Sequence, residues 1–219
     1  MKILVLNCGS SSIKYQVIDM KSATEYSLLV KGIIERIGLS DAILTHKPVG
    51  KPVGKPVYEV VRSIPDHTSG ISLILDALVD PEYGVLESIS EIAAVGHRVA
   101  HGGEYFKDSA LVDKSVKQKI EACFDLAPLH NPANLKGILA MENILPNTPQ
   151  VAVFDTSFHQ TMPAKNFMYA LPYKYYEDYR VRRYGFHGTS HKYVAQTACK
   201  LTGIDMNRSK IVTCHIGSG

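Results

Sequence analysis

Short apolar runs alternate with amphipathic segments along the whole chain. Residues 2–6 form an apolar run and residues 13–18 alternate in character, which predicts two strands joined by a loop from Asn7 to Ser12. Apolar positions at helical spacing predict a helix over 67–79. The chain also suggests helices at 114–122, 132–145 and 189–202 and strands at 92–95, 151–154 and 210–214. Strands that alternate with helices indicate an α/β fold.

Two segments have a less regular pattern. Residues 46–57 repeat Lys-Pro-Val-Gly, and their three prolines exclude a central strand or helix. We expect an exposed loop or an edge ribbon there. The tyrosine-rich residues 169–184 are interpreted as strand and loop.

Composition and charge narrow the possible functions. The 219 residues are 45% hydrophobic, enough for one large domain or for one domain and the start of another. The 24 Lys and Arg nearly balance 21 Asp and Glu, and no long basic run occurs, which argues against nucleic acid binding. The apolar N-terminal run is too short for a signal peptide, and no apolar stretch approaches the length of a membrane span. We therefore expect neither a nucleic acid nor a membrane partner.

The cysteines are widely separated. Cys8, Cys123, Cys199 and Cys214 have neither the CxxC spacing of a zinc or redox site nor the density of a disulfide scaffold. This usage is typical of the reducing cytoplasm, where we expect the protein to reside.

A strand followed by a Gly/Ser loop occurs twice. Residues 2–10 align with residues 210–218 through matched Lys, Ile, Gly and Ser positions with an apolar run between them. Chance is the alternative, because this pattern is common. The chain stops at Gly219, inside the loop of the second copy, so we expect a duplicated architecture that is cut off there.

The loop between the first two strands is a candidate phosphate site. It combines small residues and three hydroxyls with Lys14, so backbone N–H groups and polar side chains can surround phosphate oxygens. It matches neither the Walker sequence nor G-x-G-x-x-G. A serine-rich hairpin turn is the alternative.

Two charged residues follow predicted strands. Arg98 lies between His97 and a Gly102-Gly103 turn, and its guanidinium suits recognition of a carboxylate or phosphate. An ion pair with Glu104 is the alternative. Asp155 stands at the carboxyl end of a strand, where open α/β sheets keep ligand groups, and a helix N-cap is its alternative role.

Two histidines precede predicted helices. His187 lies between glycines, ahead of a helix, and its imidazole could face a transferring phosphate. His130 comes before the Asn131-Pro132 helix start, where capping or packing is as plausible as a functional role.

Together these segments resemble the acetate kinase family, in order from Met1 to Gly219. The strings that carry the resemblance are Leu6 to Lys14, Gly96 to Arg98, Leu126 to Pro132, Val153 to Pro163 and Arg183 to His191. The resemblance implies an α/β fold of the ribonuclease H-like, actin-like ATPase kind, with a mixed sheet and flanking helices. Residues 1–156 would form this domain, and residues 157–219 would begin a second, duplicated and truncated one.

The resemblance also implies roles for individual residues. The first phosphate loop would use Asn7, Ser10, Ser12 and Lys14, with Asn7 also near the metal. The second phosphate loop would begin with His215, Ser218 and Gly219, and His130 would lie near the phosphates. The acyl methyl pocket would be lined by Ala100, Leu129 and Phe186. The catalytic groups would be Arg98, Asp155 and His187.

Two positions depart from the family pattern. Ser218 replaces the usual Asn, and Ala100 stands where Val is common. We expect Ala100 to share the strand face of Arg98, because alternate residues on a strand point the same way.

The implied reaction is ATP + acetate ⇌ ADP + acetyl phosphate, by in-line transfer with Mg²⁺ or Mn²⁺, in a cytoplasmic homodimer. The family also needs an Arg, a Glu and an adenosine pocket from a C-terminal half, so this chain alone is expected to be inactive. Three alternatives stay open: a propionate or butyrate kinase, an anion-binding module without turnover, and an actin-like Mg²⁺-dependent ATPase.

Overall fold

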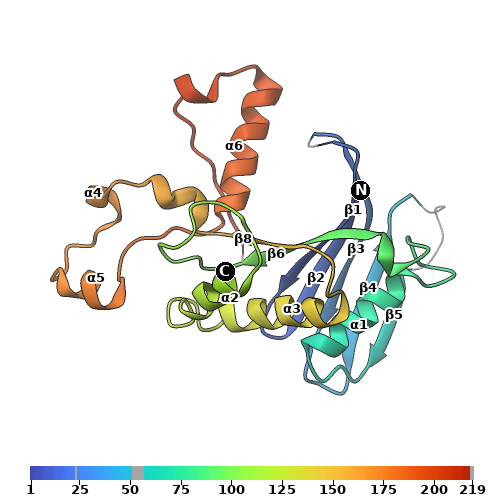
Figure 1. The fold of residues 1–219 in the computed structure, drawn as a ribbon. Helices are drawn as coiled ribbons and strands as arrows, with labels where there is room; N and C mark the ends of the chain where they lie inside the picture. The colour runs from blue at the N-terminus through green and yellow to red at the C-terminus, as the bar shows by residue number, and fades with distance from the viewer. Residues whose placement is uncertain (23, 51–56, 218–219) are drawn as a thin grey trace.

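The fold is built on one eight-stranded mixed sheet in the order β5-β4-β3-β2-β1-β6-β8-β7 (Figure 1). The computed structural model describes residues 1–22, 24–50 and 57–217. The strands are β1 (Lys2–Cys8), β2 (Ser12–Met20), β3 (Tyr26–Glu35), β4 (Ala42–Pro48), β5 (Tyr58–Arg62), β6 (Ile92–Val99), β7 (Ala110–Leu111) and β8 (Gln150–Phe154).

Strand direction brings three loops to one edge of the sheet. β1 pairs antiparallel with β2, as the predicted hairpin requires, and parallel with β6, which in turn pairs parallel with β8. Because parallel strands end on the same side, the carboxyl ends of β1, β6 and β8 lie side by side. The candidate residues that follow these strands are thereby gathered.

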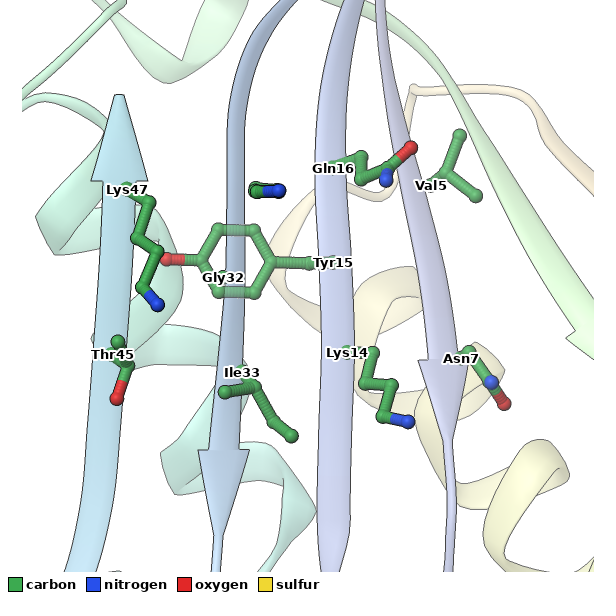
Figure 2. Close-up of a pocket in the computed structure, with 10 residues that line it drawn as sticks. Val5, Asn7, Lys14, Tyr15, Gln16, Gly32, Ile33, Thr45 and Lys47 are labelled. Carbon is green, nitrogen blue, oxygen red and sulfur yellow. The ribbon is translucent and has the colours of Figure 1, made fainter. Parts of the chain in front are cut away.

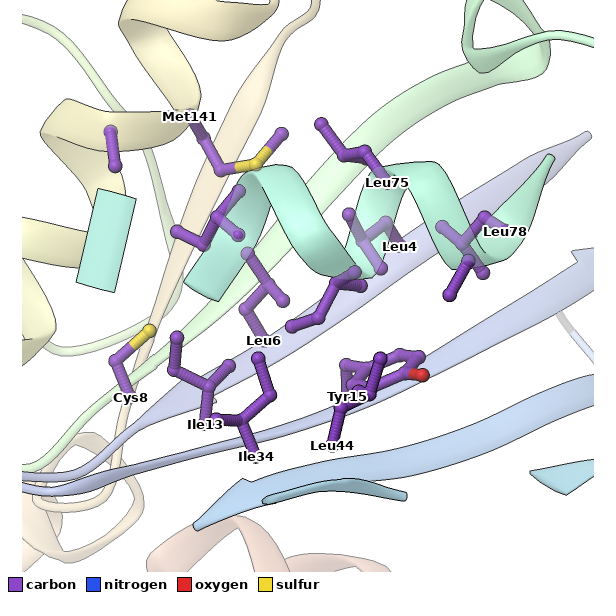
Figure 3. Close-up of a cluster of buried hydrophobic side chains, with 14 of the residues drawn as sticks. Leu4, Leu6, Cys8, Ile13, Tyr15, Ile34, Leu44, Leu75, Leu78 and Met141 are labelled. Carbon is purple, nitrogen blue, oxygen red and sulfur yellow. The ribbon is translucent and has the colours of Figure 1, made fainter. Parts of the chain in front are cut away.

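Helices cover one face of the sheet. The α-helices are α1 (His67–Leu78), α2 (Lys114–Glu121), α3 (Asn131–Ile144), α4 (Ala164–Phe167), α5 (Lys174–Tyr179) and α6 (Gly188–Thr202); 3₁₀ turns span Ile89–Glu91, Ser157–Thr161 and Met206–Arg208. Leu4, Leu6 and Ile13 are buried between the sheet and α1, and Met141 joins them from α3 (Figure 3). Asp66 caps α1 by accepting a hydrogen bond from the Ser69 amide.

A glycine in β3 lets three strands share one buried polar contact. Tyr15, Gly32 and His46 are register partners across β2, β3 and β4. A Cβ on Gly32 would collide with the Tyr15 ring, so glycine allows that ring to cross β3. The Tyr15 hydroxyl then lies 2.6 Å from Nδ1 of His46. This contact explains a glycine in a strand interior, where it otherwise weakens pairing.

Most predicted elements are confirmed, and two are wrong. The tyrosine-rich residues 169–184 contain the helix α5 and turns but no strand. Residues 210–214 form neither helix nor strand, because no strand in the described part of the chain lies beside them. Within residues 46–57, His46–Pro48 end β4 next to the edge strand β5, and residues 51–56 lie outside the described residues. No described helix is both long and apolar enough to cross a membrane.

Candidate functional site

Arg98 and Asp155 form an ion pair where β6 and β8 end. Nη2 and Nε of Arg98 donate to Oδ2 of Asp155 at 2.6 and 3.2 Å. The Asp155 side chain is only 6% exposed, whereas that of Arg98 is 29% exposed. One edge of the guanidinium is therefore fixed by a buried carboxylate, and the other can face a ligand. Neither the Glu104 pairing of Arg98 nor the N-cap role of Asp155 is seen.

Asn7, near the end of β1, lies next to the Arg98–Asp155 ion pair. Its Oδ1 lies 3.5 Å from Nη1 of Arg98, on the guanidinium edge that Asp155 leaves free. Lys14 is the register partner of Asn7 on β2. Figure 2 shows both side chains at one end of a hollow of about 400 Å³ on the sheet face. Ser10 is exposed in the loop between these strands, and Ser12 begins β2 half-buried.

The start of α6, which carries His187, is linked to Asp155 by a backbone hydrogen bond. The Gly188 amide donates to the carbonyl of Asp155 at 2.8 Å. A Cβ on Gly188 would collide with that carbonyl, so the close approach requires glycine. His187 itself has a φ of 55°, in the left-handed region. A non-glycine residue there costs about 1–3 kcal/mol, and such strain is common at functional sites.

Aromatic contacts place the side chains of Phe186, His187 and His215. The Phe186 ring, 46% exposed, packs edge-on against His101 at 5.6 Å between centroids. The His187 ring stacks on His215 at 4.2 Å. Ser190 Oγ lies 3.0 Å from Nδ1 of His215, so α6 holds the segment around residue 215. Ser218 and Gly219 lie outside the described residues.

Three other predicted residues lie at the end of β6 and at the start of α3. Ala100 is 0% exposed and lies one residue beyond the end of β6, so strand alternation does not place it on the face of Arg98. Leu129 is 75% exposed. His130 is exposed at the start of α3 and makes no side-chain capping hydrogen bond. Their roles in acyl and phosphate binding stay predictions.

Sequence reasoning missed the buried polar residues behind the site. Asn131 and Asn134 lie on the inner face of α3, and their amides bond the backbone at His101 and Ala100. Arg182 is buried against the Phe167 ring and pairs with Glu104 at 2.6 Å. In the sequence, Asn131-Pro132 indicates only a helix start, and no pattern there distinguishes a buried asparagine from an exposed one.

Buried imidazole and thiol groups close to the site are held neutral. Burial lowers the pKa of His101 to about 4, and its Nδ1 accepts a hydrogen bond from the Gly103 amide. Burial likewise raises the pKa of the Cys8 thiol to about 12. The buried Asp155 carboxylate is instead paired with the partly exposed Arg98 guanidinium.

The site fits a metal ion that arrives with a phosphate ligand. No group of three or more His, Cys, Asp or Glu side chains within the described ranges could hold a metal ion. Asn7 and Asp155 offer one amide and one carboxylate on either side of Arg98. Mg²⁺ is usually bound by one or two carboxylates plus substrate phosphates and water. These two oxygen groups therefore suit a nucleotide-bound Mg²⁺ better than a preformed cage.

The chain is similar to acetate and propionate kinases. The model of the acetokinase family matches residues 2–219. Acetate kinases from Caldanaerobacter subterraneus and Phocaeicola vulgatus are 55% and 58% identical, and each match covers 100% of this chain and 53% of the relative. The crystal structure of Porphyromonas gingivalis acetate kinase superposes with a TM-score of 0.91 at 46% identity over 100% of this chain and 53% of that one. A Francisella tularensis propionate kinase gives 0.80 at 40% identity, over 93% of this chain and 50% of that one. The chain thus spans about half the length of the curated relatives it matches.

Proposed function

We propose, from the premise that this chain belongs to the acetokinase family, that it supplies the acyl and phosphoryl side of an acetate kinase site. The observation that carries the proposal is the cluster of Asn7, Arg98 and Asp155 with His187 attached through Gly188. It places a half-exposed cation, oriented by a buried carboxylate, where three strand ends meet. Such a cluster suits a small anionic substrate.

Transfer of a phosphoryl group to acetate needs positioning more than covalent chemistry. A carboxylate oxygen of acetate bonds to the γ-phosphorus of ATP, the bond from that phosphorus to the β–γ bridging oxygen breaks, and ADP leaves with the electron pair. No protein nucleophile is required. Arg98 would hold the acetate carboxylate or the moving phosphoryl group, while Asp155 fixes the guanidinium.

His187 and the first loop would act on the phosphate oxygens. The strained backbone of His187 aims an exposed imidazole from the start of α6, where it can donate to charge that develops on the transferring group. Asn7, Ser10, Ser12 and Lys14 would contact ATP phosphates, as His215 would from the opposite side. A Mg²⁺ held by the Asn7 amide oxygen and the Asp155 carboxylate would neutralise phosphate charge when bound.

A propionate kinase is the second candidate. Phe186 and Leu129, the proposed pocket residues, are both exposed, so the described residues set no tight limit on acyl length. The match to a solved propionate kinase agrees with this. The ratio of kcat/KM for acetate, propionate and butyrate distinguishes the two candidates.

We also propose a homodimer in the cytoplasm, on the strength of the family resemblance. Sedimentation velocity of the purified protein measures the oligomeric state, and a concentration-independent monomer would contradict it.

Trapping acyl phosphate with hydroxylamine tests the proposed function. The intact enzyme, including the C-terminal half that the family also needs, should yield acetyl hydroxamate from ATP, Mg²⁺ and acetate, and omission of either ATP or acetate should abolish it. Absence of hydroxamate from the wild-type protein in its intact form would overturn the proposal.

A further inference from the structure

A single buried amide joins the ends of β1 and β6. Oδ1 of Asn134 accepts a hydrogen bond from the Ala100 amide at 2.9 Å, and Nδ2 donates to the Cys8 carbonyl at 2.6 Å. Cys8 follows Asn7 directly, and Ala100 lies two residues after Arg98. Asn134 therefore spans the two strand ends that carry the proposed ligands of the phosphates and of the acyl group.

A second amide, one turn earlier in α3, holds the next residue. Oδ1 of Asn131 accepts from the His101 amide at 3.0 Å, and Nδ2 donates to the His101 carbonyl at 2.9 Å. Nδ2 also donates to the Ile120 carbonyl at the end of α2, at 3.2 Å. The backbone from Ala100 to His101 is thus bound at three points by two side chains.

The placement of these amides is costly unless all their hydrogen bonds form. Asn131 and Asn134 are buried, on a helix face that otherwise carries core residues such as Ile138. Burial of an unsatisfied polar group is unfavourable, so an apolar residue would serve packing alone equally well. The Asn134 amide offers both the acceptor that the Ala100 N–H requires and the donor that the Cys8 carbonyl requires.

We propose that Asn134, supported by Asn131, is a positioning residue that sets the separation of Asn7 and Arg98. This inference rests on the proposed function, because it assigns α3 a part in aligning the two substrates. Loss of the Asn134 bridge frees the end of β6 to move relative to β1. A misplacement of about 1 Å between reacting groups can cost about 100-fold in rate.

The test compares Asn134→Asp and Asn134→Ala with two controls on the same helix. Asn143→Asp makes the same chemical change at an exposed position, and Ile138→Val removes one buried methyl group and lowers stability without touching a loop. Each variant is assayed well below its melting temperature, and kcat is expressed per folded protein. We expect both Asn134 variants to lose about 10-fold or more in kcat, with KM for acetate and ATP changed less than about threefold. Both controls should keep the wild-type kcat.

Hydrogen exchange reports on the bridge without reference to activity. In Asn134→Ala the Ala100 amide loses its acceptor and should exchange at least about 10-fold faster, while the His101 amide, bound by Asn131, keeps its protection. If Asn134→Asp does not fold, the kcat of Asn134→Ala is compared with that of the two controls instead.

The outcomes separate the two proposals. Wild-type kcat in a folded Asn134→Ala, or an Asn134 loss no larger than that of Ile138→Val, overturns the positioning role and leaves the proposed function standing. A wild-type protein that forms no acyl phosphate overturns the proposed function, and the positioning role falls with it. Faster exchange at Ala100 together with a selective loss of kcat supports both.

Discussion

Arg98 is the residue on which the proposed chemistry of the site depends most, because Asp155 and Asn7 already orient its guanidinium. Both nitrogens of one edge are held on the same Asp155 oxygen, and Nη1 faces Asn7. A cation with this arrangement pays no reorganisation cost when a carboxylate or phosphate arrives. Lysine has one compact charged group and cannot bond Asp155 and a ligand in the same geometry.

We expect Arg98→Ala to lower turnover by about 100-fold or more, since loss of one preorganised donor costs roughly 2.7–4 kcal/mol. Arg98→Lys should recover only part of the rate. Steady-state kinetics with acetate and ATP measure the effect, with Arg62→Ala on the exposed edge strand β5 as a control. Near-normal kcat and acetate KM in Arg98→Ala would show that the clamp is misassigned.

A buried histidine beneath the site gives stability a pH dependence. Burial lowers the pKa of His97 to about 4 from 6.5, and its Nε2 lies within 2.6 Å of the Gln150 amide. That amide is best satisfied when its nitrogen donates to Nε2, which requires the neutral imidazole. The native state therefore binds fewer protons than the unfolded state between these two pKa values.

We predict that the free energy of unfolding falls as pH drops from about 6.5 to about 4, by on the order of 3 kcal/mol from His97 alone. Above pH 6.5 this contribution is fully present. Urea unfolding at several pH values measures it, and His97→Gln should flatten the slope in this range. An equal slope in both proteins would mean that His97 is not the group responsible.

The sequence pattern predicts the charged residues of the site but not the buried asparagines that bond the backbone next to them. Arg98 and Asp155 each follow an apolar run, so their place at strand ends could be predicted. Asn131 and Asn134 could not, because polar residues on a helix are ordinarily assigned to its exposed face. Only the tertiary contacts show that their amides bond the backbone of Cys8, Ala100 and His101.

At the level of elements, α3 is set against β1 by a glycine. A Cβ on Gly137 would lie 2.5 Å from Sγ and 3.2 Å from Cβ of Cys8. Glycine costs about 1 kcal/mol relative to alanine inside a helix, so its presence reflects this close approach. The contact keeps α3, and with it Asn134, next to the end of β1.

We predict that Gly137→Ala destabilises the protein despite its higher helix propensity, because overpacking typically costs 1–3 kcal/mol. Gly70→Ala in α1 is the matched control, since the atoms nearest to a Cβ there are side-chain methyl groups of Ile13, Ile34 and Ile64, at 3.1, 3.4 and 3.6 Å. Cys8→Ala removes the nearest atom, so the double variant Cys8→Ala with Gly137→Ala should show favourable coupling. Denaturant titrations of the four proteins give the cycle, and additive effects would refute the contact.

The elements that sequence analysis missed depend on neighbours far along the chain. The helices α1, α2, α3 and α6 were expected at nearly their observed bounds, because each has local periodicity. β3 was not expected: its Gly32 reads as a break in the pattern, yet it fits the Tyr15 ring. The strand predicted in the tyrosine-rich residues 169–184 is also wrong, because Lys174–Tyr179 form the helix α5.

At the scale of the whole molecule, the site joins the sheet to the segment that follows it. The Arg98–Asp155 pair belongs to the sheet, whereas His187 and His215 belong to α6 and the residues packed on it. Figure 1 shows α6 extending away from the sheet, with its first turn at the ends of β6 and β8. The bond from the Gly188 amide to the Asp155 carbonyl links the two parts. The duplication inferred from residues 2–10 and 210–218, and a domain boundary after residue 156, stay predictions.

Phosphoryl transfer from ATP to acetate in a single turnover tests the central claim most directly. With the intact enzyme, C-terminal half included, in excess over γ-labelled ATP, labelled acetyl phosphate should form in step with ADP, and ADP formation should be far slower when acetate is omitted. The label should never reside on the protein, because the transfer is direct. ADP formed at the same rate without acetate, or no labelled acetyl phosphate with it, would contradict the assignment of this site to acetate phosphorylation.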